Sequence, residues 1–242
     1  RATAPSSCAS TPPATSSARR GNYALTLGRI CPEKGFHLAM DAAKLTGLPL
    51  GLGGEVFPYE THLRYFENEI RPRENRRRRF LGPLNALQKY RFLKRARCLL
   101  IPSLVPETSS LPAMEAMACG TPVIAFRLGA LPSLIEHGRT GFLVDSVPEM
   151  AEAILNADQI DPNVCHAWAK EFFSQERMTE QYLKRYAGII AFQSNRRRTG
   201  PRRRLGEAHL PGLRHAGRAP HDGELRLGAA LLGRAGRARQ AR

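Results

Sequence analysis

The feature that most constrains the fold of this 242-residue chain is the alternation of short apolar runs with longer helical patterns along its middle part. Runs such as NYALTLGRI (residues 22–30) and TPVIAF (121–126) are typical of strands that are buried on both faces of a sheet. Between them, segments such as KGFHLAMDAAKLTG (34–47) place apolar side chains near helical spacing and end at a glycine. Strands alternating with helices form right-handed βαβ units, so the sequence predicts an α/β fold with a doubly wound parallel sheet.

The same patterns predict the order of the elements. Strands are expected at 22–30, 48–55, 78–84, 97–103, 121–126 and 141–145, and helices at 34–47, near 60–70, and at 85–96, 110–120, 148–157 and within 165–192. In sheets of this kind ligands bind at the carboxyl ends of the strands. Polar residues that follow these strands are therefore the first candidates for a site.

The two ends of the chain differ in composition from its middle. Residues 1–20 are rich in Ser, Thr, Pro and Ala, and residues 195–242 contain 13 arginines, no lysine and 3 acidic residues. We expect both ends to be disordered tails around one folded domain at 21–194, because neither can bury enough apolar surface. Out-of-frame translation of a GC-rich gene is an alternative origin of both ends, and a basic tail that binds nucleic acid or anionic lipid is a further one. The net charge of +16 is mostly a property of the ends, since residues 21–194 carry 21 basic and 18 acidic residues.

The cysteine pattern and the hydropathy of the chain indicate the cellular compartment of the protein. The five cysteines are scattered without C-x-x-C spacing, which favours reduced thiols over a disulfide framework or a zinc site. No apolar run approaches the roughly 18 residues that a membrane span needs, and the first 20 residues lack the apolar region of a secretory signal. These features predict a cytoplasmic location and no transmembrane segment, with peripheral membrane association left open.

Cationic residues follow the first expected strand. The loop GRICPEKG contributes Arg29 and Lys34, which together can hold a phosphate group, Arg29 as a planar fork and Lys34 as a point charge. The alternative is a solvated loop with a surface salt bridge to Glu33. Spacing alone does not decide between them.

Two glutamates follow the strand at 97–103. In PSLVPETSSLPAME, Ser109 or Ser110 can cap the next helix and Pro112 suits its first turn, which would leave N–H groups that attract an anion. Glu107 precedes this helix start, and Glu115 lies within the helix. Glu115 is either an ordinary solvated helix residue or, because its neighbours are apolar, a carboxylate that needs a hydrogen-bonding ligand.

Other features are weaker. The glycines of 129–144 suit tight turns near a ligand or a plain loop, and His137 is interpreted as a loop-surface residue without a neighbouring nucleophile. The basic run RENRRRR lacks interleaved aromatic residues and is interpreted as a solvated edge. The chain has no GxGxxG, P-loop, H-E-x-x-H or G-x-S-x-G motif.

Three stretches of residues 22–192, in the right order, resemble the C-terminal half of retaining family-four glycosyltransferases: GRICPEKGFHLAMDAA, PETSSLPAMEAMACGTPVIAFRLGALPSLIEHGRTGFLV and FFSQERMTEQYLKRY. The resemblance implies one half of a GT-B architecture, a Rossmann-like domain that binds the nucleotide-sugar donor. It also implies transfer of a hexose with retention of configuration. Neither a cofactor nor a metal is implied, because cationic side chains take the place of the metal in this fold.

The resemblance also implies roles for individual residues. Arg29 and Lys34 would hold the donor diphosphate and stabilise the leaving nucleoside diphosphate, Glu107 would contact the hydroxyls of the sugar, and Glu115 would accept hydrogen bonds from the ribose. The remaining donor-binding residues that it implies are Gly28, Leu84 beside Pro83 at the base, and Thr108, Ser109, Ser110 and Leu111 at the sugar and phosphates. Family members often have Gly-Phe-Gly after the first glutamate, where this chain has TSS, so sugar selection is left open.

The expected partners follow from this resemblance. They are a nucleotide-sugar donor and an unknown acceptor, either a saccharide or a lipid-linked molecule. Only about 20 residues precede the first strand, where the family has an acceptor domain. We therefore expect a fragment without that domain, the alternative being a separate partner that supplies an N-terminal half. The rival functions are a non-catalytic nucleotide-sugar-binding module and nucleic-acid binding through the Arg-rich tail; nucleic acid is not expected as a partner.

Overall fold

The computed structural model describes residues 21–199, with side chains up to residue 192. Its strands form one six-stranded parallel sheet in the order β3-β2-β1-β4-β5-β6. The strands are β1 (Ala24–Leu27), β2 (Leu50–Gly53), β3 (Arg78–Gly82), β4 (Cys98–Ile101), β5 (Val123–Phe126) and β6 (Gly141–Val144). The predicted doubly wound parallel sheet is confirmed, and its strand order reverses between β1 and β4.

The helices follow the predicted positions with three differences. They are α1 (Phe36–Thr46), α2 (Glu60–Tyr65), α3 (Ala86–Arg95), α4 (Leu111–Ala118), α5 (Leu131–Leu134), α6 (Val147–Asn156), α7 (Pro162–Phe173) and α8 (Gln175–Thr199), with short turns η2 (Pro32–Lys34), η3 (Phe66–Ile70), η4 (Arg71–Arg73) and η5 (Ala157–Gln159). Helix α5 was not predicted. The segment expected as one helix near 60–70 is α2 followed by the π-helical turn η3, and the 3₁₀ turn η4 contains Pro72. Helix α8 continues beyond the expected domain boundary at 194.

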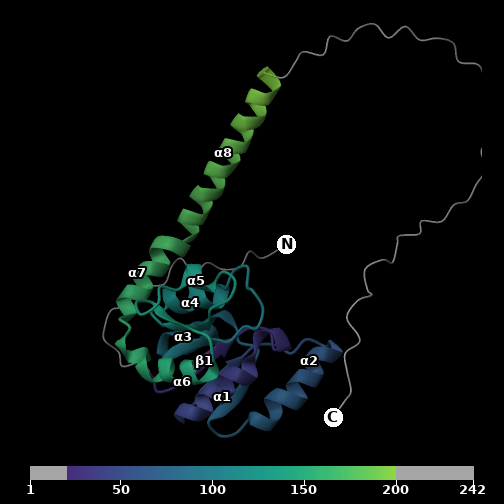
Figure 1. Ribbon diagram of the computed structural model, residues 1–242, viewed down its shortest axis with the longest axis vertical. Helices are drawn as coiled ribbons and strands as arrows, with labels where there is room; N and C mark the ends of the chain where they lie inside the picture. Colours follow the sequence, from purple (N-terminus) through teal and green to yellow (C-terminus); the bar gives the residue numbers. More distant parts are fainter. Residues whose placement is uncertain (1–20, 200–242) are drawn as a thin grey trace, which may run out of the picture. The chain divides into compact units, whose positions relative to one another are not determined.

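Alternate residues of each strand enter two separate cores. Ala24, Cys98 and Ile124 pack on the face covered by α1 and α6, while Leu25, Leu99 and Val123 pack on the face covered by α3, α4, α5 and α7. Figure 1 shows the sheet around β1 between α1 and α6 on one side and α3, α4 and α5 on the other. Because successive strand residues point to opposite faces, strands with both faces buried must be apolar throughout.

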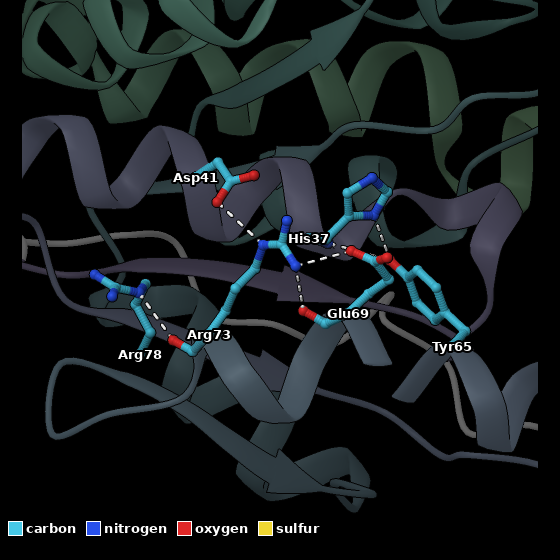
Figure 2. A network of polar contacts seen from close by, with 6 residues as sticks. All are labelled: His37, Asp41, Tyr65, Glu69, Arg73 and Arg78. Carbon is cyan, nitrogen blue, oxygen red and sulfur yellow. Dashed lines mark hydrogen bonds and ion pairs between the residues drawn. The ribbon is translucent and has the colours of Figure 1, made fainter. Parts of the chain in front are cut away.

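Helix α1 is joined to the segment after α2 by a polar network around Arg73 (Figure 2). The Arg73 guanidinium donates through Nε to Asp41 of α1 (3.1 Å) and through Nη1 to the Glu69 carboxylate (2.8 Å). Nearby, the Tyr65 hydroxyl lies 2.8 Å from Nδ1 of His37 and accepts from the His37 backbone N–H. The network fixes the irregular turns η3 and η4 against a regular helix.

The chain divides into two units after Asn195, and the sheet and helices α1 to α7 belong to the first. Within residues 21–199, none of the helices combines the length and the apolar character that a membrane crossing needs. The expected disorder of residues 1–20 and 200–242 lies outside the described residues.

Candidate functional site

The loops that follow β1 and β4 meet where the strand order reverses. The Glu33 carbonyl of the β1 loop accepts from the Leu104 backbone N–H at 2.8 Å and from the Ser103 hydroxyl at 3.3 Å, both in the β4 loop. Gly35, at φ 63°, lies so close to the same loop that a Cβ atom there would be 2.1 Å from the Pro102 carbonyl oxygen. A glycine is therefore required at this position, and the close approach brings the residues next to Gly35 and Pro102 together.

Lys34 and Glu107 form an ion pair across this junction. The Lys34 Nζ atom lies 2.5 Å from Oε1 of Glu107, and their side chains are 27% and 9% exposed. The pair is shielded from water more than a surface salt bridge, so loss of either partner leaves a partly buried charge. The structure thus brings together two of the predicted site residues, one from each side of the switch point.

The surface salt bridge to Glu33, considered as an alternative, is not formed by either cation of the loop. The pKa of Glu33 is held below its usual range by a backbone N–H and by the Cys31 thiol, which both bond its carboxylate. Arg29 is exposed, and within residues 21–192 no hydrogen bond or ion pair joins its side chain to Lys34 or Glu107. The structure therefore does not bring Arg29 into this cluster.

Glu115 is paired with a lysine that sequence reasoning did not identify. Nζ of Lys89, on α3, lies 2.6 Å from Oε1 of Glu115, on α4, and the side chains are 34% and 21% exposed. Lys89 supplies a hydrogen bond to this carboxylate on an apolar helix, and the expected contact of Glu115 with a ligand stays a prediction. The α3 helix begins with a capping box of Asn85 and Gln88, which predicts the helix start but gives no sign of the role of Lys89.

The start of α4 carries four of the predicted donor-binding residues. Ser110 is the N-cap residue by position and is buried, but its side chain makes no capping hydrogen bond. Thr108 and Ser109 are exposed, and the Leu111 side chain is 68% exposed. The first turn of α4 therefore keeps backbone N–H groups that no side chain caps, as an anion site at a helix start requires.

Gly28 and Leu84 lie at the same edge of the sheet, after β1 and β3. The Gly28 backbone N–H donates to the Gly53 carbonyl at 3.1 Å, which continues the β1–β2 ladder. The Leu84 side chain covers Gly53, since a Cβ atom on that glycine would be 2.7 Å from Cδ1 of Leu84. Because β2 and β1 separate β3 from β4, Leu84 is placed on the far side of the β1 loop from Glu107.

A third loop, after β5, fixes the backbone of Glu107. The Ala130 N–H donates to the Glu107 carbonyl at 2.7 Å, and a Cβ atom on Gly129 would be 2.3 Å from the Glu107 nitrogen. The glycines of 129–144 were interpreted either as tight turns near a ligand or as plain loop residues. Gly129 does make a close approach, and the atoms that it approaches are backbone atoms of Glu107. His137 is exposed and its Nδ1 atom accepts from the Leu143 N–H, as expected for a loop residue.

A parallel sheet of this strand order, with charged side chains gathered at its switch point, defines the Rossmann-like class of domains, in which ligands bind at this edge. The sequence profile of the family described as "Glycosyl transferases group 1" matches residues 11–171. The chain therefore belongs to the group 1 glycosyl transferases.

Individual relatives match shorter stretches. The D-inositol 3-phosphate glycosyltransferase of Pseudarthrobacter chlorophenolicus is 46% identical over 65 residues, which cover 27% of this chain and 15% of that protein. The N-acetyl-alpha-D-glucosaminyl L-malate synthase of Bacillus anthracis is 31% identical over 97 residues, covering 37% of this chain and 26% of that protein. The chain thus spans well under two thirds of the length of the curated relatives it matches.

Solved structures share the fold. Anabaena HepE, solved in complex with UDP and glucose, has a TM-score of 0.62 at 23% identity, covering 70% of this chain and 49% of that chain. AviGT4, a glycosyltransferase involved in avilamycin A biosynthesis, has a TM-score of 0.63 at 20% identity, covering 77% of this chain and 57% of that chain. The predicted Rossmann-like half of a GT-B architecture agrees with these matches.

Proposed function

We propose that residues 21–194 form the donor-binding domain of a retaining glycosyltransferase that transfers a hexose from a nucleotide diphosphate sugar. The observation that carries the proposal is the Lys34–Glu107 pair, which places a cation and an acceptor of hydroxyl hydrogen bonds side by side at the switch point. A diphosphate requires the first group and a sugar requires the second. Family membership supports the same reaction class.

In this proposal Lys34 holds the diphosphate and stabilises the negative charge that develops on it as the glycosidic bond breaks. Such fixed charges are commonly the largest contribution to catalysis of this kind. Arg29, which is exposed at the same loop, would close onto the diphosphate when the donor binds. The uncapped N–H groups at the start of α4, together with Thr108, Ser109 and Leu111, would contact the sugar and phosphates.

The two glutamates would then act at different parts of the donor. Glu107 would give up part of its contact with Lys34 so that its carboxylate can accept hydrogen bonds from sugar hydroxyls. Glu115 would accept hydrogen bonds from the ribose while Lys89 keeps its carboxylate oriented. Gly28 and Leu84 would line the nucleotide from the β1 and β3 ends of the sheet.

Calorimetry with UDP, GDP and ADP, and with the corresponding glucose or mannose nucleotides, tests the donor site. We expect Lys34→Met to lower the affinity for the preferred nucleoside diphosphate by at least about tenfold, because the site loses a charge-assisted contact. Lys184→Met is the matched control, since Lys184 also pairs with a glutamate but lies on the exposed face of α8. No binding by the wild-type chain, or equal binding by both variants, would refute the proposal.

Glu107→Gln separates sugar from diphosphate recognition. We expect it to leave the affinity for the free nucleoside diphosphate unchanged or raised, because Lys34 loses its competitor, and to abolish any extra affinity for the nucleotide sugar. Glu115→Ala should lower the affinity for both the nucleoside diphosphate and the nucleotide sugar, because both contain the ribose. If Glu107→Gln lowers both affinities equally, Glu107 does not contact the sugar.

Transfer itself needs an acceptor site, which the resemblance assigns to the other half of a GT-B enzyme. We therefore expect this chain alone to bind donor, and to transfer or hydrolyse it when an N-terminal half of a group 1 enzyme is added. Donor binding without turnover under any such condition would instead identify a nucleotide-sugar-binding module.

A further inference from the structure

Three side chains that commonly bind metal ions meet beside the β1 loop. One ligand atom from each of Cys31, Glu33 and His62 lies within 4.8 Å of the other two. Cys31 and Glu33 belong to the loop and turn after β1, whereas His62 comes from α2. In the part of the chain that the structure describes, no other group of histidine, cysteine and acidic residues meets this spacing.

His62 is the second sign of a ligand. Its side chain belongs to a residue that is only 8% exposed, and its Nδ1 atom is buried without any hydrogen-bond partner. The ring is held in place by an edge-to-face contact with Tyr59 at 5.1 Å between centroids. A buried ring nitrogen without a partner is costly, and a metal ion that accepted its lone pair would remove that cost.

The other two residues complete the donor set. Cys31 is 2% exposed, and its thiol bonds the Glu33 carboxylate and makes a weak 3.6 Å contact with the Arg29 carbonyl. Glu33 is exposed, so its carboxylate gives an ion a path from solvent. A thiolate, an imidazole and a carboxylate suit Zn²⁺, which commonly takes three protein ligands and a water in tetrahedral sites.

We propose that Cys31, Glu33 and His62 bind one zinc ion, with water as the fourth ligand. On binding, the thiol proton leaves to solvent, a sulfur–zinc bond forms, and the two anionic ligands neutralise the dication. Sulfur and nitrogen ligands of a tetrahedral zinc ion lie about 3.5 Å apart. The cluster therefore has to contract by up to about 1.3 Å, which the exposed turn that carries Glu33 can accommodate.

The site would have a structural role next to the proposed donor site. Glu33 and Lys34 belong to the same turn, η2, so zinc would tie the turn that carries Lys34 to α2. Sequence reasoning favoured reduced thiols because it searched for closely spaced cysteines. This cluster has one cysteine, and its histidine is supplied by a different element of the fold. Zinc binding is independent of the donor, so failure of either proposal leaves the other intact.

The test is zinc titration of the full chain after removal of bound metal, with Co²⁺ as a spectroscopic probe. We expect one zinc per chain and a thiolate-to-cobalt charge-transfer band. Cys31→Ser and His62→Gln should each weaken zinc binding by more than about tenfold, and Cys31→Ser should abolish the band. The conservative replacements allow folding to be checked by circular dichroism.

Cys119→Ser is the matched control, because Cys119 is a partly exposed cysteine at the end of α4. It should leave zinc affinity and the cobalt band unchanged. Protection of the Cys31 thiol from alkylation by added Zn²⁺, followed by mass spectrometry of wild-type protein, provides a measurement that does not depend on any variant. Substoichiometric binding, an unprotected Cys31, or equal loss in the Cys119 variant would overturn the proposal.

Discussion

Gly129→Ala should disrupt the site through backbone contact alone. Gly129 has φ 58°, and a Cβ atom there would lie 2.3 Å from the nitrogen and 2.4 Å from the oxygen of Glu107. Both atoms belong to the backbone, so no side-chain rotation can relieve the overlap. Gly138 is the matched control, because it has φ 78° and a Cβ atom there would meet nothing within 4 Å.

The two substitutions share one cost and differ in another. Placing alanine at a left-handed position costs about 1–2 kcal/mol, part of which is offset by the reduced freedom of the unfolded chain, so Gly138→Ala should cost about 1 kcal/mol. Gly129→Ala also forces the Glu107 backbone away by about 1 Å to reach an ordinary contact. That shift removes the Ala130–Glu107 hydrogen bond, worth about 1 kcal/mol, and the partly buried pair with Lys34, worth about 1–2 kcal/mol. Together with the cost of about 1 kcal/mol that Gly138→Ala shares, the total for Gly129→Ala is about 3–4 kcal/mol.

Thermal unfolding followed by circular dichroism measures the difference. For a domain of this size 1 kcal/mol corresponds to about 2–4 °C, so the midpoint should fall by about 3 °C in Gly138→Ala and by about 10 °C in Gly129→Ala. Calorimetry should show a larger loss of donor affinity in Gly129→Ala than in Gly138→Ala. Equal midpoints in the two variants would show that the β5 loop does not hold Glu107.

Arg73→Lys removes the planar fork that bonds two carboxylates (Figure 2), so it should lower the free energy of unfolding in urea by about 1–2 kcal/mol. Arg71 forms an exposed pair with one glutamate, and Arg71→Lys should change the same free energy by less than about 0.5 kcal/mol. Burial lowers the pKa of His37, so the free energy of unfolding should fall as the pH drops through about 6.5, the pKa in the unfolded chain. His37→Gln should reduce this pH dependence, measured as urea midpoints from about pH 7 to about pH 5. A double-mutant cycle of Lys89→Met and Glu115→Gln should give a coupling of about 1 kcal/mol, since both side chains are partly exposed, and a coupling near zero would mean that the pair does not form in solution.

The sheet could be predicted from the sequence because its signal is local. Strands with both faces buried must be apolar, and TPVIAF or the run ending at Leu27 carries that property without reference to the rest of the fold. The segment after Glu60 was less predictable. Its helical spacing is real, but the π-helical turn at Phe66–Ile70 and the following turn depend on Arg73 reaching Asp41 in another helix, which no local pattern reveals.

Some residues of the candidate site could likewise be predicted from the sequence, and others could not. That Lys34 and Glu107 would lie at one edge follows from their positions after two strands, combined with the rule for ligand sites in parallel sheets. Lys89, Gly129 and His62 were missed as partners, because each is brought to its place by tertiary contacts. Lys89 follows an ordinary capping box, and Gly129 is one of several loop glycines.

The pairing of charges changes what donor binding must involve. Considered one at a time, Lys34 is a free cation and Glu115 a carboxylate that awaits a ligand, whereas in the structure each is already neutralised by a residue from a neighbouring element. Under the proposed function a diphosphate would compete with Glu107 for Lys34, and this competition would weaken its binding when it comes alone. In the same proposal a nucleotide sugar would offer Glu107 hydroxyl groups in exchange, so the competition would favour the complete donor over the product nucleotide. A site with unpaired charges would bind the product as tightly as the donor and would release it slowly.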